Sequence, residues 1–568
     1  LRKTNRQLRQ SSLSALGVLV KNYGTDKKAA DLFKNVLTEV APLINDADLH
    51  LTHLALALTV SILQVHSASA ANVSEQILPR SFDLFKSSLL QGLALESLLN
   101  LLSELAKINA KNASYDVLLN QLITIASAKD LSKQVLLNIA KGIAALSVNP
   151  ESQKATVSRF IKDLSKPNDL LALYSLGEIG RRTDLSSHDS LQKSVLACFD
   201  SAQEETRQAA SFALGNIAVG NLKTYLPHIL EEIKKNPKIK YLLLHSMREI
   251  IVRQSASTQG VEALHAYQKD ILNILFEECQ NDEEGTRNVV AECLGKLAVI
   301  SPSELVPVFS NQIKTDNANT RSTIVTALKF AIVEKSQPID HLLQSEMSKY
   351  LDLLKDKDLN VRRNTLLTLN YAAHNKPILI REILPTYLPL IYAESKVKPE
   401  LIREVDLGPF KHKVDDGLEV RKAAFECMYT LLDTCLDRVN IPNFITTLVD
   451  GLKDHYDIKM LADLMLIRLS FLAGPALLES LDQLVEPLRS AIGTKPKEGA
   501  PKQDVERNDE LIRSTLRAVA AITKVPNAES NLKFEEFLRT TIRTPDYLDK
   551  FNAIVAETAS AADSMDLS

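Results

Sequence analysis

Residues 204–218 read EETRQAASFALGNIA, and this motif returns in recognisable form along most of the chain. Each clear copy has an acidic residue or Asn, then Thr or Val, then Arg, and then an apolar segment of helical character. The aligned arginines of the clear copies are Arg207, Arg287, Arg321, Arg362 and Arg421. Weaker copies align at Arg9, Thr52, Gln91, Lys133, Leu171, Lys240, Lys459 and Arg513.

The marked positions recur with a period of roughly 40 residues, which is the period of two-helix HEAT and armadillo repeats. Each helix pair leaves an apolar face that the next pair covers, so the pairs stack into a solenoid. We expect the Asp or Asn before the second helix to cap its free N–H groups. We expect the Arg to reach the neighbouring repeat or a carboxylate. The sequence therefore predicts an all-α fold, a HEAT/armadillo-type α-solenoid.

Two intervals are longer than this period. The first excess falls on residues 399–417, PELIREVDLGPFKHKVDDG, where apolar and polar residues alternate on both sides of Gly408-Pro409. This alternation predicts one inserted β-hairpin. The second excess falls on residues 493–509, GTKPKEGAPKQDVERND, which is rich in Lys, Pro and Gly and has no apolar period. That composition predicts a flexible loop.

The hairpin allows two interpretations. Pro409 cannot adopt the positive φ of a type I′ turn, so we expect a tip of three or four residues. The tip residues Leu407 and Phe410 are large and apolar, which suits a plug that enters a partner protein. The hairpin could equally fold back and seal an irregular junction between repeats. The pattern alone favours neither interpretation.

The domain organisation follows from these insertions. We expect HEAT repeats over residues 1–398, the hairpin over 399–417 and further HEAT repeats over 418–557. A polar tail, residues 558–568, is expected to fray. Residue 1 is Leu and a helical pattern begins almost at once, so we expect the chain to be part of a longer protein.

Composition narrows the function. The formal net charge of the 568 residues is −3, which argues against nucleic acid as a partner. The most apolar segment, residues 51–65, is too short and too polar to span a membrane. The five cysteines form no CxxC pair, which is typical of a reduced cytosolic or nuclear chain.

Catalytic and cofactor motifs are absent from the sequence, and we predict no enzyme activity and no cofactor. His50 and His53 could share a helix face, but without a third ligand they do not predict a metal site. The segment from Asp454 to Lys459, DHYDIK, resembles an acid–base cluster. It occupies the cap position of a repeat, where capping and contacts between repeats are expected.

Several long motifs resemble the family of cullin-associated and neddylation-dissociated proteins. They are ELIREVDLGPFKHKVDDG, EVRKAAFECMYTLLDTCLDR, DGLKDHYDIKMLADLMLIRLS and LRKTNRQLRQSSLSALGVLVKNY. The resemblance covers essentially the whole chain, which is similar to the C-terminal half of such proteins. It implies a HEAT-repeat superhelix that wraps an unneddylated cullin–RING ubiquitin ligase and promotes exchange of its substrate receptors.

The resemblance also implies where the partner binds. The hairpin would occupy the place on the cullin where the adaptor docks, so that the two compete. Cullin contacts are implied for Leu407, Pro409, Phe410, Lys411 and His412. Arg403, Val405 and Val414 are implied to shape the hairpin. A monomer in the cytoplasm and nucleus, with neither nucleic acid nor membrane as a partner, is the corresponding expectation.

Two other functions fit a helical-repeat chain. A nuclear transport receptor of the importin-β type has the same kind of superhelix, although its cargo face is expected to be strongly acidic. A phosphatase-type scaffold is expected to have more uniform repeats and no β insertion. Both alternatives describe binding proteins and not enzymes.

Overall fold

The computed structural model of the chain describes residues 1, 5–25, 27–166, 168–332, 338–407, 410–496, 499 and 501–565. Of these, residues 27–31, 406, 407, 410–412 and 558–565 are described by their backbone alone. Within these ranges every regular element is a helix except two strands, which pair with each other. The prediction of an α-solenoid with one inserted hairpin is confirmed.

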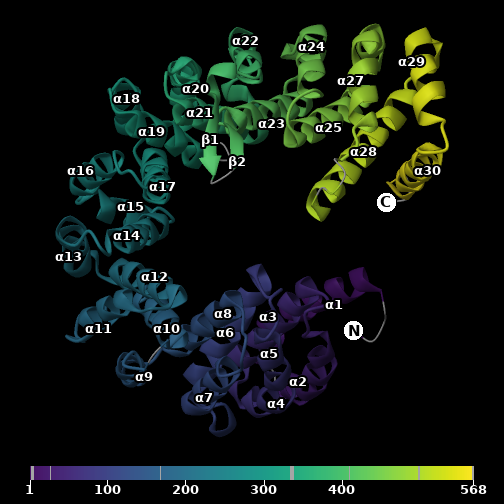
Figure 1. The fold of residues 1–568 in the computed structure, drawn as a ribbon. Coiled ribbons are helices and arrows are strands. Elements are labelled where there is room, and N and C mark those ends of the chain that lie inside the picture. Colours follow the sequence, from purple (N-terminus) through teal and green to yellow (C-terminus); the bar gives the residue numbers. More distant parts are fainter. Residues whose placement is uncertain are drawn as a thin grey trace. The chain divides into compact units, whose positions relative to one another are not determined.

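The helices form two rows, which Figure 1 shows for each part of the chain. The B row contains the second helix of each repeat, and its members pack on one another in chain order within each compact unit. These helices are α1 (Arg6–Tyr23), α3 (Leu49–Val65), α6 (Gly92–Ile108), α8 (Lys133–Leu146), α10 (Leu170–Gly180), α12 (Glu204–Gly220), α14 (Lys240–Gln254), α17 (Glu284–Ile300), α19 (Ala318–Ala331), α21 (Leu359–Asn375), α23 (Leu418–Thr434), α25 (Tyr456–Leu472), α28 (Lys502–Thr523) and α30 (Leu548–Met565).

The A row contains the first helix of each repeat, which in places is split in two. These helices are α2 (Lys27–Val40), α4 (Ala70–Gln76), α5 (Leu78–Phe85), α7 (Tyr115–Ala126), α9 (Pro150–Asp163), α11 (Leu191–Ala197), α13 (Leu222–Lys235), α15 (Thr258–His265), α16 (Gln268–Glu278), α18 (Pro302–Gln312), α20 (Ile339–Leu351), α22 (Leu384–Glu394), α24 (Ile441–Gly451), α26 (Gly474–Glu479), α27 (Leu481–Gly493) and α29 (Leu532–Phe537).

Every position marked by the repeat motif lies in a B-row helix or directly before one. The caps follow the prediction in several repeats. The side chain of Asn317 accepts a hydrogen bond from the N–H of Thr320, and Asp358 accepts from Asn360 and Val361. These side chains satisfy N–H groups that have no partner inside the helix.

The repeat arginines of α12, α17 and α19 share one local role. The guanidinium of Arg321 donates to the carbonyls of Thr315 and Asp316, which lie six and five residues before it. Arg207 and Arg287 make the same pair of bonds to their own preceding turns. The arginine therefore fastens the turn between the A helix and the B helix.

Some of these arginines also join neighbouring repeats. Nε of Arg321 lies 2.7 Å from Asp356 of the next repeat, with 7% and 8% of the two side chains exposed. Arg421 makes the corresponding pair with Asp454 at 2.8 Å. The predicted contact of the arginine with a carboxylate and with the neighbouring repeat is thus present at Arg321 and Arg421, whereas the bonds to its own turn were not predicted.

Two glycines allow adjacent B helices to approach closely, a feature that the sequence analysis did not identify. A Cβ atom on Gly215 would lie 2.5 Å from the carbonyl oxygen of Ser246 on α14. A Cβ on Gly295 would collide with the carbonyl of Ala327 on α19. Each glycine follows the repeat arginine of its helix by eight residues, and this constant spacing could have identified both glycines from the sequence.

The chain divides into two compact units, residues 1–271 (unit 1) and 272–568 (unit 2). The dividing position lies inside α16, and the hairpin is part of unit 2. Each unit contains its own stack of A and B helices. The described residues include no helix with the length and apolar character needed to cross a membrane.

Two local predictions are wrong. The loop predicted over residues 493–509 ends early, because α28 begins at Lys502 and has Pro501 as its N-cap residue. After Pro501 the segment contains no further Pro or Gly, so nothing opposes a helix there. The tail predicted to fray from residue 558 is helical as far as Met565. This segment is rich in Ala, the strongest helix former.

Candidate protein-interaction surface: the β-hairpin insertion

The inserted hairpin consists of β1 (Ile402–Leu407) and β2 (Phe410–Asp415), paired antiparallel. Pairing continues to Leu407 and Phe410, so two residues link the strands and the predicted tip of three or four residues is wrong. A type II′ turn needs positive φ only at its first central residue, which is glycine in this sequence. Gly408 and Pro409 themselves lie outside the described residues.

The strand register divides the hairpin into two faces. Positions 403, 405 and 407 of β1 pair with 414, 412 and 410 of β2, so these six positions share one face. We call this the valine face; it contains Arg403, Val405, Leu407, Phe410, His412 and Val414. The opposite, charged face contains Ile402, Glu404, Asp406, Lys411, Lys413 and Asp415.

Six of the eight residues proposed from the sequence therefore share one face. Lys411 belongs to the charged face, where its position pairs with that of Asp406. Pro409 lies outside the described residues, as do the side chains of Leu407, Phe410, Lys411 and His412.

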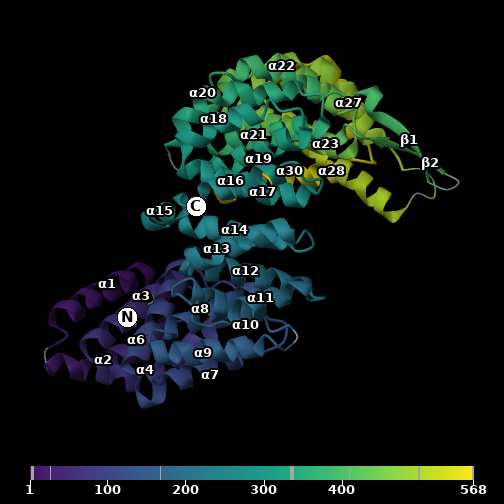
Figure 2. The ribbon, with the colours of Figure 1, turned by 90° about the vertical axis from the view of Figure 1, so that its left-hand side faces the viewer.

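The side chains near the base of the hairpin are accessible. Arg403, Glu404 and Lys413 are exposed, and Val405 and Val414 are half-buried. Ile402 is 38% exposed, which is high for a large apolar residue. Figure 2 shows the strands extending away from the neighbouring helices of unit 2. The hairpin thus presents two faces beyond the helical rows.

The C-terminal end of the hairpin is fastened to the solenoid through Arg421 of α23. Arg421 lies 2.9 Å from Asp415, the last residue of β2, and 2.8 Å from Asp454 in the next repeat. Arg421 is 2% exposed, and burial alone would lower its pKa. The bonds to Asp454 and Asp415 outweigh burial and raise the pKa. A buried cation thus joins the insertion to two consecutive repeats.

The ion pair between Arg403 and Asp416 at the base holds the two ends of the hairpin together. Nε of Arg403 donates to Asp416 at 2.7 Å, and the hydrogen bond to Arg403 lowers the pKa of that carboxyl. The N–H of Asp416 donates to the carbonyl of Leu401 at 3.1 Å. A Cβ on Gly417 would lie 3.0 Å from the Leu401 side chain, so a glycine suits this tight exit.

The N-terminal end has a second fastening point. Lys398 lies 2.8 Å from Glu394 at the end of α22, and Arg362 of α21 lies 3.6 Å from the same carboxylate. Both ends of the insertion are therefore connected to buried or half-buried charges of the helical body. Sequence reasoning missed Asp415, Arg421 and Glu394 as supports, although Arg421 was already marked by the repeat motif.

The other candidate residues have structural contacts. His53 Nδ1 lies 2.7 Å from the hydroxyl of Ser97 on α6. His455 is the N-cap of α25, where its Nδ1 accepts from the N–H of Asp457. Asp454 binds Arg421 and is unavailable for acid–base chemistry. DHYDIK is thus a capping and inter-repeat segment, as predicted.

Taken together, the fold and the supported hairpin define the class of HEAT-type helical-repeat scaffolds with a β-hairpin insertion. A solved structure of Kap95p binding RanGDP shares the fold, with a TM-score of 0.51 and 12% identity over 98% of this chain and 71% of that one. The family model TIP120, described as TATA-binding protein interacting (TIP20), matches residues 379–542, which include the hairpin.

Two relatives match along essentially all of the chain. The Dictyostelium discoideum protein named cullin-associated NEDD8-dissociated protein 1 is 50% identical over 580 residues, covering 100% of this chain and 47% of its own length. The Arabidopsis thaliana protein of that name is 44% identical over 570 residues, covering 98% and 46%. The chain belongs to the family of cullin-associated NEDD8-dissociated proteins. It spans about half the length of these relatives.

Proposed function

We propose that this chain is a non-enzymatic cullin-binding regulator that competes with substrate-receptor adaptors on unneddylated cullin–RING ubiquitin ligases. The observation that carries this proposal is the hairpin, which is fastened at both ends and whose strands extend away from the helices (Figure 2). Apolar side chains that are partly accessible on a fixed support, as Val405 and Val414 are, suit the central part of a protein interface. The name shared by the relatives indicates the cullin as the partner.

The mechanism needs only two binding surfaces that overlap. If the hairpin and an adaptor use the same end of the cullin, each weakens binding of the other. When both keep contacts elsewhere, a short-lived ternary complex allows one to accelerate release of the other. Receptor exchange then follows from differential affinity, without hydrolysis of any substrate.

The proposal includes the setting in which the chain works. We expect a monomer that acts in both the cytoplasm and the nucleus and binds the cullin through protein contacts. Nucleic acid is not expected to compete, because the net charge of −3 gives no general attraction to phosphate. The importin-like alternative rests on similarity of fold alone, and no observation at the hairpin favours it.

The decisive experiment compares the two faces of the hairpin. Val405→Ala/Val414→Ala truncates the valine face, and Glu404→Ala/Lys413→Ala makes the same number of changes on the charged face. Affinity for a purified unneddylated cullin–RING complex is measured by titration calorimetry for both variants. We expect the valine pair to lose about tenfold in affinity and the charged pair to lose at most about twofold.

Adaptor displacement is the second measurement. The valine pair should release a labelled adaptor from the cullin more slowly than the unchanged chain. Equal affinity of the unchanged chain and the valine pair would show that the hairpin does not contact the cullin. A loss of thermal stability with binding preserved would instead favour the hairpin as a seal between repeats.

A further inference from the structure

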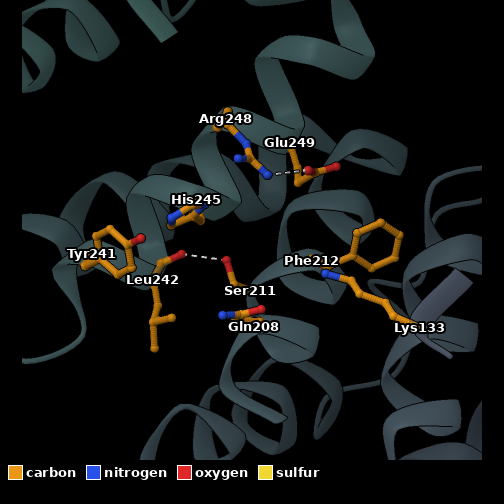
Figure 3. Close-up of a pocket in the computed structure, with 9 residues that line it drawn as sticks. All are labelled: Lys133, Gln208, Ser211, Phe212, Tyr241, Leu242, His245, Arg248 and Glu249. Atoms are coloured by element: carbon orange, nitrogen blue, oxygen red, sulfur yellow. Dashed lines mark hydrogen bonds and ion pairs between the residues drawn. The ribbon is translucent and has the colours of Figure 1, made fainter. Parts of the chain in front are cut away.

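Unit 1 contains a cavity of about 260 Å³ between its B-row helices, far from the hairpin in sequence. Residues of α8, α12 and α14 line it, and Figure 3 shows them around one opening. On α14, Tyr241, His245 and Arg248 follow the i, i+4, i+7 spacing that places side chains on one helix face. Lys133 reaches the same cavity from α8. We call this site the α8–α14 pocket.

The walls of the α8–α14 pocket are held in place by internal contacts. The Ser211 hydroxyl donates to the carbonyl of Leu242 at 2.7 Å, which joins α12 to α14 (Figure 3). The rings of Tyr241 and His245 meet edge to face with their centroids 4.6 Å apart. Phe212 makes a similar contact with Tyr174 of α10 at 5.5 Å. The pocket is therefore formed before any ligand enters.

Two carboxylates near the α8–α14 pocket, Glu249 and Glu178, are paired with arginines. Glu249 lies 3.0 Å from Arg248 and 3.7 Å from Arg253. The buried Glu178 of α10 lies 2.6 Å from Arg181. Each of these acids is therefore neutralised by at least one arginine.

Three cations of the same region remain without such a partner. Lys133, Lys141 and Arg182 have no carboxylate within 4.0 Å in the part of the chain that the structure describes. Burial lowers the pKa of Lys141, and the nearby guanidinium groups lower it further against the attraction of Glu178. Burial and Arg181 lower the pKa of Arg182 in the same way. Glu178 acts on both groups in the opposite direction. Cations in excess of the nearby carboxylates favour the approach of an anion.

The neutral side chains add a specific shape. Burial lowers the pKa of His245 to about 4, so its ring is uncharged near neutral pH. Tyr241, His245 and Phe212 then offer aromatic surface, with Lys133 and Arg248 beside it. A cavity of about 260 Å³ has room for one or two amino-acid side chains.

We propose that the α8–α14 pocket and its neighbouring cations Lys141 and Arg182 bind an acidic peptide segment of a partner protein. A carboxylate side chain enters the pocket, and the cations outside it attract the rest of the segment. A nucleic acid would need a longer row of cations spaced to follow phosphates, and the whole chain has a net charge of −3. The site lies in unit 1, so it does not depend on the cullin contact proposed for the hairpin.

The test uses a fluorescein-labelled peptide of twelve glutamates and the whole chain, with binding measured by fluorescence anisotropy. The variant Lys133→Glu/Lys141→Glu reverses two charges on α8. Lys193→Glu/Lys223→Glu makes the same change of charge on α11 and α13 of the A row, where both lysines are exposed. We expect the α8 variant to lose at least about tenfold in affinity and the A-row variant to lose less than about twofold.

A third variant separates the cavity from the surrounding charge. Gln208→Trp places a large side chain at the cavity wall and leaves every cation unchanged. It should weaken peptide binding by about fivefold, because the carboxylate loses its place in the pocket. Normal binding by this variant would overturn the pocket as the site of entry.

Two further outcomes would overturn the proposal as a whole. One is equal weakening by the α8 and A-row variants, which would indicate non-specific attraction between charges. The other is tighter binding of a twelve-nucleotide poly-uridine than of the peptide, which would identify a nucleic-acid site. Circular dichroism of all three variants should match the unchanged chain, since Lys133, Lys193, Gln208 and Lys223 are exposed and Lys141 is only half-buried.

Discussion

Arg421 shows how one buried residue supports the insertion. Its guanidinium lies within 2.9 Å of both Asp415 and Asp454 and is almost fully enclosed. Arg421→Met would leave the buried Asp454 carboxylate without its cation, which typically costs about 3–5 kcal/mol. We expect the first unfolding transition of this variant to have its midpoint at a clearly lower urea concentration than that of the unchanged chain.

An exposed pair of the same chemistry is the matched control for Arg421. Arg468 and Asp433 lie 2.5 Å apart with 44% and 35% of their side chains exposed. Arg468→Met should change the same transition by less than about 1 kcal/mol, because water screens the exposed pair. Equal effects of the two substitutions would contradict the supporting role of Arg421.

Asp463 of α25 makes stability depend on pH. The residue is 0% exposed at the contact with α28, and Thr515 Oγ1 lies 2.9 Å from one carboxylate oxygen. Burial raises the pKa of Asp463 to about 7. The folded chain therefore keeps this proton between pH 4 and 7, where an unfolded chain has lost it. Stability falls as pH rises through this range, by about 4 kcal/mol in total, and is then constant above pH 7.

The substitution Asp463→Asn isolates this effect, because an amide has nearly the same shape and does not titrate. We expect the asparagine variant to unfold later than the unchanged chain at pH 8 and to differ little from it at pH 4.5. The measurement is urea unfolding at half-unit steps of pH. A parallel pH dependence of both proteins would assign the effect to other groups.

At the scale of elements, the glycines decide how closely the B helices pack. A Cβ on Gly295 would lie 2.6 Å from Cβ of Phe330 and would collide with the α19 backbone. Gly295→Ala should therefore push α17 from α19 and destabilise unit 2 by about 1–3 kcal/mol. Gly17→Ala is the control, because a Cβ at Gly17 in α1 meets nothing within 4 Å.

The control should shift stability in the opposite direction. Alanine is a better helix former than glycine, so Gly17→Ala should stabilise by up to about 1 kcal/mol. Calorimetric unfolding of both variants measures whether each substitution raises or lowers the stability. If both substitutions stabilise the chain, the close approach of α17 and α19 does not contribute to its stability.

The sequence predicted those elements whose signal is periodic. The B-row helices follow from apolar spacing and from the repeat arginine, and β1 and β2 follow from strict alternation. Boundaries were less predictable, because the start of α28 depends on where the effect of Pro501 ends. Alternation within each strand already separated Lys411 from Phe410, but only the register shows which positions of β1 share a face with which positions of β2.

The supports of the candidate site could not be read from the sequence for a different reason. Asp454 lies 33 residues after Arg421, and only the stacking of α23 on α25 brings the two together. The glycine contacts are similar, because a missing Cβ has meaning only beside a particular neighbouring backbone. Long-range geometry thus added what the local patterns lacked.

At the scale of the whole molecule, the chain spans 47% of the length of its Dictyostelium discoideum relative. Suppose that the proposed cullin contact is correct and that the rest of the longer relative makes a second contact with the same cullin. A second contact on one chain acts at high effective concentration and raises overall affinity by about 10²–10⁴. We therefore expect the present chain to bind a cullin–RING complex more weakly than the full-length relative does.

Three proteins make this comparison interpretable: the present chain, the full-length Dictyostelium discoideum relative, and the 47% of that relative that matches this chain. Titration of each against the same unneddylated cullin should give similar affinities for the two shorter chains and a higher affinity for the longest. Because the two shorter chains are 50% identical, a difference between them would report sequence and not length. Equal affinity of the relative and its matched segment would place all of the cullin contact inside the part of the family that this chain represents.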